Sequence, residues 1–292
     1  MPEGRLIPHH DEAIVLRTWP FHEADLLVSL FTRERGKVKG VARHAMRSRR
    51  RFGGALEPAT QVMAHYTERP REDLVRMDSF EIVWSPLMAP VDALRSAGLA
   101  LVVEVIEEAM PELAAEDNVF RLAVAVLREM QGSGIREQGS GIRDQGSEGD
   151  HGAVWVGVTY FCVWMCRLMG WWPELAHCVV CGLHLANPAL RGQDVWWSPV
   201  ADGVTCADDR RPQSRKVSAA AVAESYRMAK MSLEQFMGEV EPPQRASPPG
   251  TPKQGQQLYR DLGVFAVSVL ERHLERRIRS AAALGSKARN GN

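Results

Sequence analysis

The chain has 292 residues, of which 45% are hydrophobic and 25% are charged, and its formal net charge is zero. This composition is ordinary for a soluble globular protein and provides enough apolar material for a core without metals or disulfides. No apolar run approaches the ~18 residues of a membrane span, no signal peptide precedes the first predicted strand, and the length predicts two domains of roughly 150 residues each.

Five short segments near the N-terminus are predicted to be β-strands, because they are rich in β-branched or alternating residues and are separated by Gly, Pro and polar breaks. They are Ala13–Trp19, Leu26–Thr32, Lys37–His44, Thr60–Thr67 and Leu74–Val83. Glu34-Arg35-Gly36 is predicted to join the second and third strands as a tight hairpin turn. Five strands in about 70 residues predict a small closed barrel, and the OB-fold is the commonest barrel of that size.

A basic run overlaps the third predicted strand and the loop after it, and no acidic residue interrupts the run before Glu57. A cationic strand face beside a cationic loop is suited to follow a nucleic-acid backbone, and arginine both binds phosphate bidentately and stacks on bases. The alternative is a solvated charged loop, but the unbroken run favours a nucleic-acid site, without separating DNA from RNA. The eight predicted binding residues are Arg35, Lys37, Lys39, Arg43, Arg47, Arg49, Arg50 and Arg51.

Helical periodicity begins after Pro90. Val91–Met110 and Asn118–Met130 are predicted helices, with Asp92 and Asp117 as N-terminal caps or first-turn acids. An acidic stretch at 104–117 contains no Lys or Arg and is predicted to be the outer face of a helix, which would repel phosphate.

The middle of the chain contains a tandem duplication, GSGIREQ followed by GSGIRDQ, within residues 132–149. Such a Gly/Ser-rich polar segment predicts a flexible surface insertion. Further helices are predicted at Gly152–Gly170, Val217–Val240 and Gln256–Leu284, with a Pro-rich loop at Glu241–Gly255. The last helix is expected to carry Arg272, Arg276, Arg277 and Arg279 on its outer face.

Cysteines suggest a metal site in the non-helical stretch 171–216. Cys178 and Cys181, followed by Gly182, form the CxxC turn of a zinc knuckle. Cys206 is the only later cysteine, and the matching position three residues on is Asp209, whose carboxylate can also bind zinc. A thioredoxin-type redox pair and a site that has lost its metal are the alternatives. His177, His184 and Asp208 also lie near in sequence.

The remaining cysteines, Cys162 and Cys166, are predicted to be core residues, because they share an apolar face of one helix. We expect a reducing, cytoplasmic protein whose cysteines are reduced or metal-bound. The sequence has no phosphate-binding P-loop, no HExxH, no GxSxG elbow and no dinucleotide-binding glycine motif. It offers no nucleophile with a base, which argues against an enzyme.

Taken in order, these features resemble the bacterial recombination mediator family RecO. The residues that carry the likeness are Glu12–Arg17, His22–Leu27, Leu30–Thr32, Arg35–Lys37, Gly40–Arg43, Arg49–Pro58, Cys178–Gly182, Trp197–Pro199, Gly203 with Cys206, and Leu274–Ser280. The family's zinc loop usually ends in a second CxxC, and here Asp209 replaces its last cysteine. The duplicated insertion is not part of the family pattern.

The resemblance implies an α+β protein, with an OB-fold β-barrel followed by a mainly α-helical domain that carries a zinc-knuckle-like insertion. We therefore expect a nucleic-acid-binding domain at 1–85 and a helical domain at 86–292, with the flexible insertion at 132–149 and a zinc-finger-like loop at 176–212. The metal would be Zn²⁺, held by Cys178, Cys181, Cys206 and Asp209.

The resemblance also implies a non-enzymatic function in recombinational gap and break repair. Such a protein binds single- and double-stranded DNA, anneals complementary strands without ATP, and helps to load the recombinase RecA on coated DNA. Its partners would be RecR and the acidic C-terminal tail of the single-stranded-DNA-binding protein, in the cytoplasm at the nucleoid. The alternatives are an RNA-binding OB-fold protein of translation or ribosome assembly, an enzyme with an unfamiliar site, and a protein–protein adaptor.

Overall fold

The computed structural model describes residues 6–48, 50–69, 72–131, 148–185, 193–198, 200, 203–239 and 254–287. The chain divides into two compact units: Met1–Gln138 with Arg279–Gly285, and Gly139–Ile278 with Ser286–Asn292. The expected boundary between residues 85 and 86 stays a prediction. Most of the predicted insertion at 132–149 and of the predicted loop at 241–255 lies outside the described residues. Among the described helices, none has the length and hydropathy that crossing a membrane requires.

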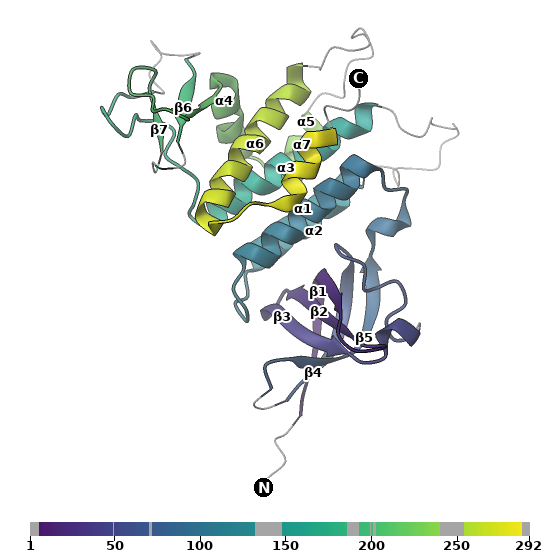
Figure 1. Cartoon of the computed structure of the whole chain (residues 1–292). Helices are drawn as coiled ribbons and strands as arrows, with labels where there is room; N and C mark the ends of the chain where they lie inside the picture. Colours follow the sequence, from purple (N-terminus) through teal and green to yellow (C-terminus); the bar gives the residue numbers. More distant parts are fainter. Residues whose placement is uncertain are drawn as a thin grey trace. The chain divides into compact units, whose positions relative to one another are not determined.

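The first unit contains five strands: β1 (Ile7–Pro20), β2 (Leu26–Thr32), β3 (Gly36–Ala42), β4 (Gln61–Glu68) and β5 (Val75–Trp84). They close into a barrel in the order β1-β2-β3-β5-β4 (Figure 1). Neighbouring strands are antiparallel except β3 and β5, which run parallel. The barrel is an OB-fold, so the predicted fold is confirmed. β1 begins earlier than predicted, because its polar first residues pair with β4.

The barrel interior is filled by side chains that alternate along the strands, among them Val15, Leu30 and Val62. Gly40 permits the parallel pairing that closes the barrel. A Cβ atom at this position would lie 2.4 Å from the backbone oxygen of Val75. Any side chain at position 40 would therefore push β3 and β5 apart.

The loop between β3 and β4 seals one end of the barrel. It contains the short 3₁₀ helix η1 (Ala45–Arg47) and buries Phe52 and Ala55 in the barrel core. The ring of Phe52 meets that of Phe80 edge-on, with 5.4 Å between centroids. The Phe80 N–H donates to the carbonyl of Arg51 at 2.8 Å. These anchors fix the loop and leave its polar side chains at the surface.

Three helices belong to the first unit: α1 (Ala93–Ala109), α2 (Asp117–Met130) and α7 (Arg279–Lys287), and a 3₁₀ helix η2 (Pro86–Met88) precedes α1. The carboxylate of Asp92 accepts hydrogen bonds from two backbone N–H groups in the first turn of α1. Asp117 lies in the first turn of α2. The predicted cap and first-turn acid are therefore confirmed.

Buried Gln61 of β4 connects α2 to the barrel. The guanidinium of Arg128 donates to the side-chain oxygen of Gln61 at 2.7 Å. The side-chain amide of Gln61 in turn donates to the carboxylate of Glu12 in β1. Arg33 donates to Glu12 at 3.3 Å and to Asp117 at 2.7 Å. These bonds attach both the first and the last turn of α2 to the strands.

The second unit contains the helices α3 (Glu148–Leu168), α4 (Ala219–Met228), α5 (Leu233–Glu239) and α6 (Gln254–Leu274), and the strands β6 (Val195–Trp197), β7 (Val204–Thr205) and β8 (Arg215–Val217). The strands form a sheet in the order β7-β6-β8. α3 packs against α6 where a Cβ atom on Gly263 would lie only 2.6 Å from Oγ1 of Thr159. Buried Trp197 meets Phe265 edge-on at 5.7 Å, which joins the sheet to α6.

The predicted single helix Val217–Val240 is wrong, because α4 and α5 are separate helices. Two ring donors from α3 account for the break. The indole N–H of Trp164 donates to the carbonyl of Met228 at 3.2 Å, and the hydroxyl of Tyr160 donates to that of Met231 at 2.9 Å. These carbonyls are therefore satisfied from outside, and the helix can end there.

The predicted helix Gln256–Leu284 is also wrong as one element, since the chain turns between α6 and α7. The carboxylate of Glu271 accepts the backbone N–H of Ile278 at 3.0 Å, and Glu275 has a φ of 53°. The predicted row of arginines is consequently not one helical face.

Candidate nucleic-acid interface and metal centre

Lys37 of β3, a predicted DNA-binding residue, is buried in the first unit. Its Nζ donates to the backbone carbonyl of Glu107 at 2.6 Å. That carbonyl lies in the last turn of α1, where intrahelical donors are lacking. A cation there also interacts favourably with the helix dipole. Lys37 thus caps α1 from the barrel.

Lys39 and Arg35 also have partners within the first unit. Nζ of Lys39 lies 2.6 Å from a carboxylate oxygen of Glu112, and this hydrogen bond raises the pKa of Lys39 and lowers the pKa of Glu112. The guanidinium of Arg35 lies 2.8 Å from Glu68 and 2.8 Å from Nε2 of His9. Both cations are partly neutralised by these contacts.

The acidic stretch at 104–117 is partly exposed, as predicted for an outer face, with Glu112 and Asp117 at the surface, but several of its carboxylates also have partners. Four of its carboxylates bind donors that come from distant parts of the sequence, and they hold the barrel and α7 to α1 and α2. The pairs are Glu107 with Ser29, Glu112 with Lys39, Asp117 with Arg33, and Glu104 with Ser280.

Three predicted cations are exposed on the loop that seals the barrel: Arg43, Arg47 and Arg50. Their side chains form no hydrogen bond or close ion pair with the other residues that the structure describes. Arg51 lies beside them, but its guanidinium donates to the carbonyl of Arg43 at 2.5 Å and stacks on the ring of Phe52. Arg51 therefore stiffens the loop that presents the other three.

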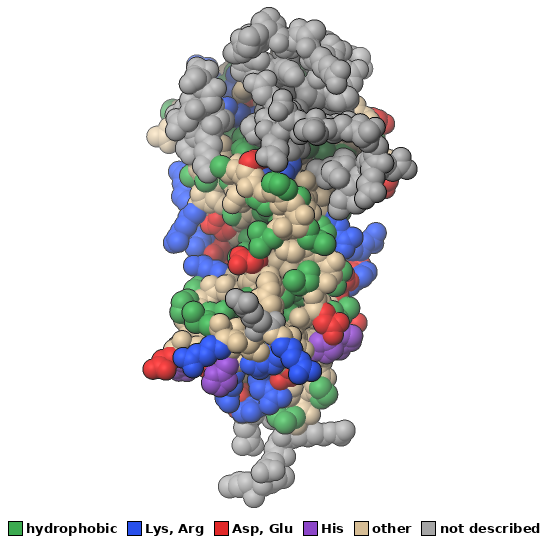
Figure 2. All heavy atoms as spheres, turned by 90° about the vertical axis from the view of Figure 1, so that its right-hand side faces the viewer, with side chains coloured by type: hydrophobic (Ala, Val, Ile, Leu, Met, Phe, Trp, Pro, Cys, Tyr) green, Lys and Arg blue, Asp and Glu red, His purple; other side chains and the backbone are tan. Residues whose placement is uncertain are grey.

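The eight predicted cations thus differ in availability. Four have internal partners, three are exposed, and Arg49 lies outside the described residues. In the lower part of Figure 2, over the barrel, Lys and Arg side chains lie among His, Asp and Glu side chains. Their role in DNA binding stays a prediction.

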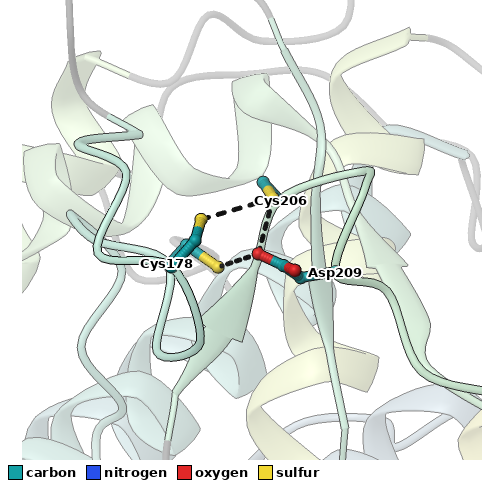
Figure 3. Close-up of side chains that lie close together, drawn as sticks. Cys178, Cys206 and Asp209 are labelled. Atoms are coloured by element: carbon teal, nitrogen blue, oxygen red, sulfur yellow. Dashed lines mark hydrogen bonds between the residues drawn. The ribbon is translucent and has the colours of Figure 1, made fainter.

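The four residues predicted as metal ligands converge in the second unit, with their ligand atoms within 4.8 Å of one another. The Sγ atoms of Cys178 and Cys206 each lie 3.2 Å from Oδ2 of Asp209 (Figure 3). The Sγ atom of Cys181 lies 3.9 Å from that of Cys206. In a tetrahedral zinc site with Zn–S bonds of about 2.3 Å, sulfur atoms are about 3.8 Å apart. The donor types and spacing therefore fit zinc.

Local backbone geometry brings the ligands together. Gly182 has a φ of 74°, a left-handed conformation that favours glycine, and its N–H donates to the carbonyl of Cys178 at 2.9 Å. The N–H of Val179 donates to the carbonyl of Val204 at 3.0 Å, which fixes the CxxC turn beside β7. Cys206 follows directly after that strand.

The thiols of the chain fall into two environments. Hydrogen bonding to Asp209 raises the pKa of Cys181 to about 12, and the thiol donors lower the pKa of Asp209. A zinc ion would reverse the effect on the thiols, because a coordinated thiol is deprotonated. Cys162 and Cys166 are fully buried in α3, and burial raises the pKa of both. Their predicted role as core residues is confirmed.

Comparison with known proteins identifies the family. The family model described as "Recombination protein O N terminal" matches residues 6–86. The DNA repair protein RecO of Koribacter versatilis is 43% identical over 267 residues, which cover 91% of this chain and 94% of that protein. The chain belongs to the RecO family. The RecO proteins of Bifidobacterium adolescentis and Anaeromyxobacter sp. strain Fw109-5 are 32% and 29% identical, over 72% and 91% of this chain and 77% and 91% of their own length.

The RecO N-terminal match covers all five barrel strands and the whole basic run, so the resemblance seen in the sequence is confirmed. The sequence of this RecO family member did not reveal two further cations near that run. Arg69 and Arg76 line a groove together with Arg43. Acidic residues surround both arginines in the sequence, so the net charge of this segment did not indicate a basic site. The two arginines come near Arg43 only because the barrel closes with β5 beside β3.

Proposed function

We propose that the protein is a non-enzymatic DNA-binding protein of recombinational repair, which uses its N-terminal domain, residues 1–85, to bind nucleic acid. The observation that carries this proposal is the loop with exposed Arg43, Arg47 and Arg50, anchored by buried Phe52. Relatives named DNA repair protein RecO support the same role. Guanidinium groups bind phosphate in bidentate geometry, and such binding weakens as salt rises.

The proposed activity is annealing of complementary single strands without ATP. Two strands repel each other through their phosphates, and a cationic surface that neutralises both lowers this barrier. Base pairing then supplies the free energy, so the reaction needs no catalytic residue. In this proposal the exposed arginines act most strongly, whereas Lys37 and Lys39 support the fold through α1 and Glu112.

Further partners are proposed to be RecR and the acidic C-terminal tail of the single-stranded-DNA-binding protein. Binding to both would place the protein on coated DNA, in the cytoplasm at the nucleoid, where it would help to load RecA during gap and break repair. An acidic tail requires exposed cations. Arg121 on α2 is exposed, whereas Arg128 is already bonded to Gln61.

For the helical domain, residues 86–292, we propose that Cys178, Cys181, Cys206 and Asp209 hold a structural Zn²⁺. Zinc would cross-link the CxxC turn to the segment after β7 and so stabilise this part of the second unit. The fit of the donor spacing to a tetrahedral site supports this proposal.

The decisive experiment is annealing of two complementary labelled oligonucleotides by the purified full-length protein without ATP, with and without the cognate single-stranded-DNA-binding protein. We expect fast annealing that persists on coated strands. The double variant Arg47→Glu, Arg50→Glu should slow annealing at least about tenfold, since each reversal replaces attraction to a phosphate by repulsion. The control variant Lys230→Glu, Arg277→Glu changes the same amount of charge in the second unit and should leave annealing of bare strands unchanged.

Folded protein that does not anneal DNA would contradict the proposal. Equal annealing by the loop variant and the wild type would contradict the role of the loop. A strong preference for RNA over single-stranded DNA would favour an RNA-binding protein of translation or ribosome assembly instead.

A further inference from the structure

A groove of about 360 Å³ lies on the barrel beside the proposed DNA-binding loop. It is lined by residues of the turn after β1, the end of β3 and the loop between β4 and β5. Phe21 belongs to this lining and is 43% exposed. The rings of Phe21 and His22 are in T-shaped contact with 4.3 Å between centroids, and the exposed part of the Phe21 ring is available for a flat ligand.

The turn that carries Phe21 is held in place before any ligand arrives. The N–H of Phe21 donates to the carbonyl of Asp25 at 3.0 Å, which closes the turn. The carboxylate of Asp25 accepts the backbone N–H of His44 at 2.7 Å, and Ala24 accepts that of Met46 at 3.2 Å. These bonds attach the turn to the cationic loop, so the entropy cost of ordering it when a ligand binds would be small.

The side chains that line the groove have a net positive formal charge. Arg43, Arg69 and Arg76 contribute three cations, and Asp25 and Glu72 contribute two carboxylates. The negative charges are engaged internally: Asp25 accepts the His44 N–H, and Glu72 lies 3.4 Å from Arg69. Arg76 has Asp78 as a partner at 2.7 Å, whereas Arg43 forms no direct ion pair with a described carboxylate, although its charge helps to lower the pKa of Asp25.

We propose that this groove binds a single DNA strand, with Phe21 stacking on an unpaired base and with Arg43, Arg69 and Arg76 near the phosphates. The inference rests on the proposed function and deepens it, because it assigns a base-contacting site beside the phosphate-contacting loop. Aromatic stacking is independent of base sequence, because every base has a π-face. Duplex DNA does not offer this contact, since its base faces are covered by neighbouring pairs.

The β-sheet face next to this groove is not available to DNA. In OB-folds the β2–β3 face and the two flanking loops bind oligonucleotides. Here Lys37 and Lys39 on β3 and Ser29 on β2 are bonded to Glu107 and Glu112, so this part of the face is occupied by the protein itself. The groove between the loops remains open, and we expect its residues to contact the single DNA strand.

The test measures binding of the full-length protein to three labelled DNAs of equal length: oligothymidine, an abasic strand, and a duplex. Wild type is compared with Phe21→Ala and Phe21→Trp, and Tyr226→Ala serves as a control that removes an exposed aromatic ring from the second unit. We expect Phe21→Ala to weaken oligothymidine binding at least about fivefold. Binding of the abasic strand and the duplex should stay within about twofold, and Phe21→Trp should keep wild-type affinity.

A second measurement does not depend on the variants. Irradiation of wild-type protein with an oligonucleotide that contains 5-iodouracil should cross-link the peptide that carries Phe21. Unchanged oligothymidine binding by Phe21→Ala, or a cross-link only to peptides outside the groove, would overturn the inference while leaving the proposed function intact. Equal weakening on all three DNAs would also overturn it. Failure of the wild type to bind any DNA would overturn the proposed function as well.

Discussion

The ammonium group of Lys39 lies 2.6 Å from the carboxylate of Glu112, so a strand of the barrel and the segment after α1 neutralise each other. Lys37, two residues earlier, is buried against the last turn of α1. The strand part of the basic run therefore serves the fold, and the loop part is available to a ligand. This division leads to predictions that separate the two groups of cations.

The salt dependence of DNA binding should identify the cations that bind phosphate. Replacing Arg47 and Arg50 by alanine should reduce the slope of log K against log salt by ~0.7 for each single-strand phosphate that the protein no longer neutralises. Lys39→Ala should change both slope and affinity little, because Lys39 is paired with Glu112. Fluorescence anisotropy at several salt concentrations measures both quantities. A larger slope change for Lys39→Ala than for the loop variant would contradict this assignment.

Lys37 should matter for stability more than Lys39. In Lys37→Met the aliphatic chain stays, but the carbonyl of Glu107 no longer has its charged donor. We expect a decrease of about 1–3 kcal/mol in the free energy of unfolding. The matched control Lys39→Met removes a half-exposed ion pair, which is worth about 0–1 kcal/mol. Urea denaturation followed by circular dichroism compares the variants, and equal effects would show that Lys37 does not act as a cap.

The attachment of α7 should depend on pH through Glu104. Burial alone would raise the pKa of Glu104, but hydrogen bonds from the hydroxyl and N–H of Ser280 and the N–H of Arg279 lower it on balance. The bound carboxylate therefore stabilises the fold above its ordinary pKa of about 4.5, and this contribution is lost as the pH falls through the lower folded value.

Glu104→Gln should consequently lower the free energy of unfolding near pH 7 by about 1 kcal/mol, the value of a helix cap, and so lower the melting temperature. The difference in melting temperature between Glu104→Gln and the wild type should decrease as the pH is lowered toward 4 and below. Glu116→Gln is a suitable comparison, because Glu116 is exposed and its side chain makes no cap hydrogen bond to α2. If the difference in melting temperature stays constant or increases at low pH, the charge of Glu104 is not the source of the stabilisation.

Zinc retention should depend on Asp209 and not on its neighbour. Asp209→Ala removes one of four ligands, so a competing chelator should remove zinc at a concentration at least about tenfold lower than for the wild type. Asp209→Cys should hold zinc more tightly, because it completes a four-thiolate site. Asp208→Ala removes an exposed carboxylate next to the site and serves as the control. Metal analysis by mass spectrometry after chelator titration gives the result, and equal retention by all four proteins would exclude Asp209 as a ligand.

Local patterns were sufficient to predict the barrel strands and the metal-ligand cluster. Strand alternation is a property of neighbouring residues, and the spacing of Cys178 and Cys181 belongs to a single turn. The break between α4 and α5 was not predictable in this way, because its cause is a pair of donors on α3, Tyr160 and Trp164, about 70 residues earlier. The partners of the acidic stretch are equally distant in sequence, so local charge patterns could not reveal the contacts that this partly exposed stretch makes.

The bond between Glu104 and Ser280 spans 176 residues of sequence. The first unit is thus assembled from two separate segments, and residues 139–278, which make up most of the second unit, are synthesised between them. During synthesis the barrel, α1 and α2 leave the ribosome long before α7 exists. The surface that α7 later covers stays uncovered while residues 139–278 are translated. Completion of the first unit is therefore among the last events of folding.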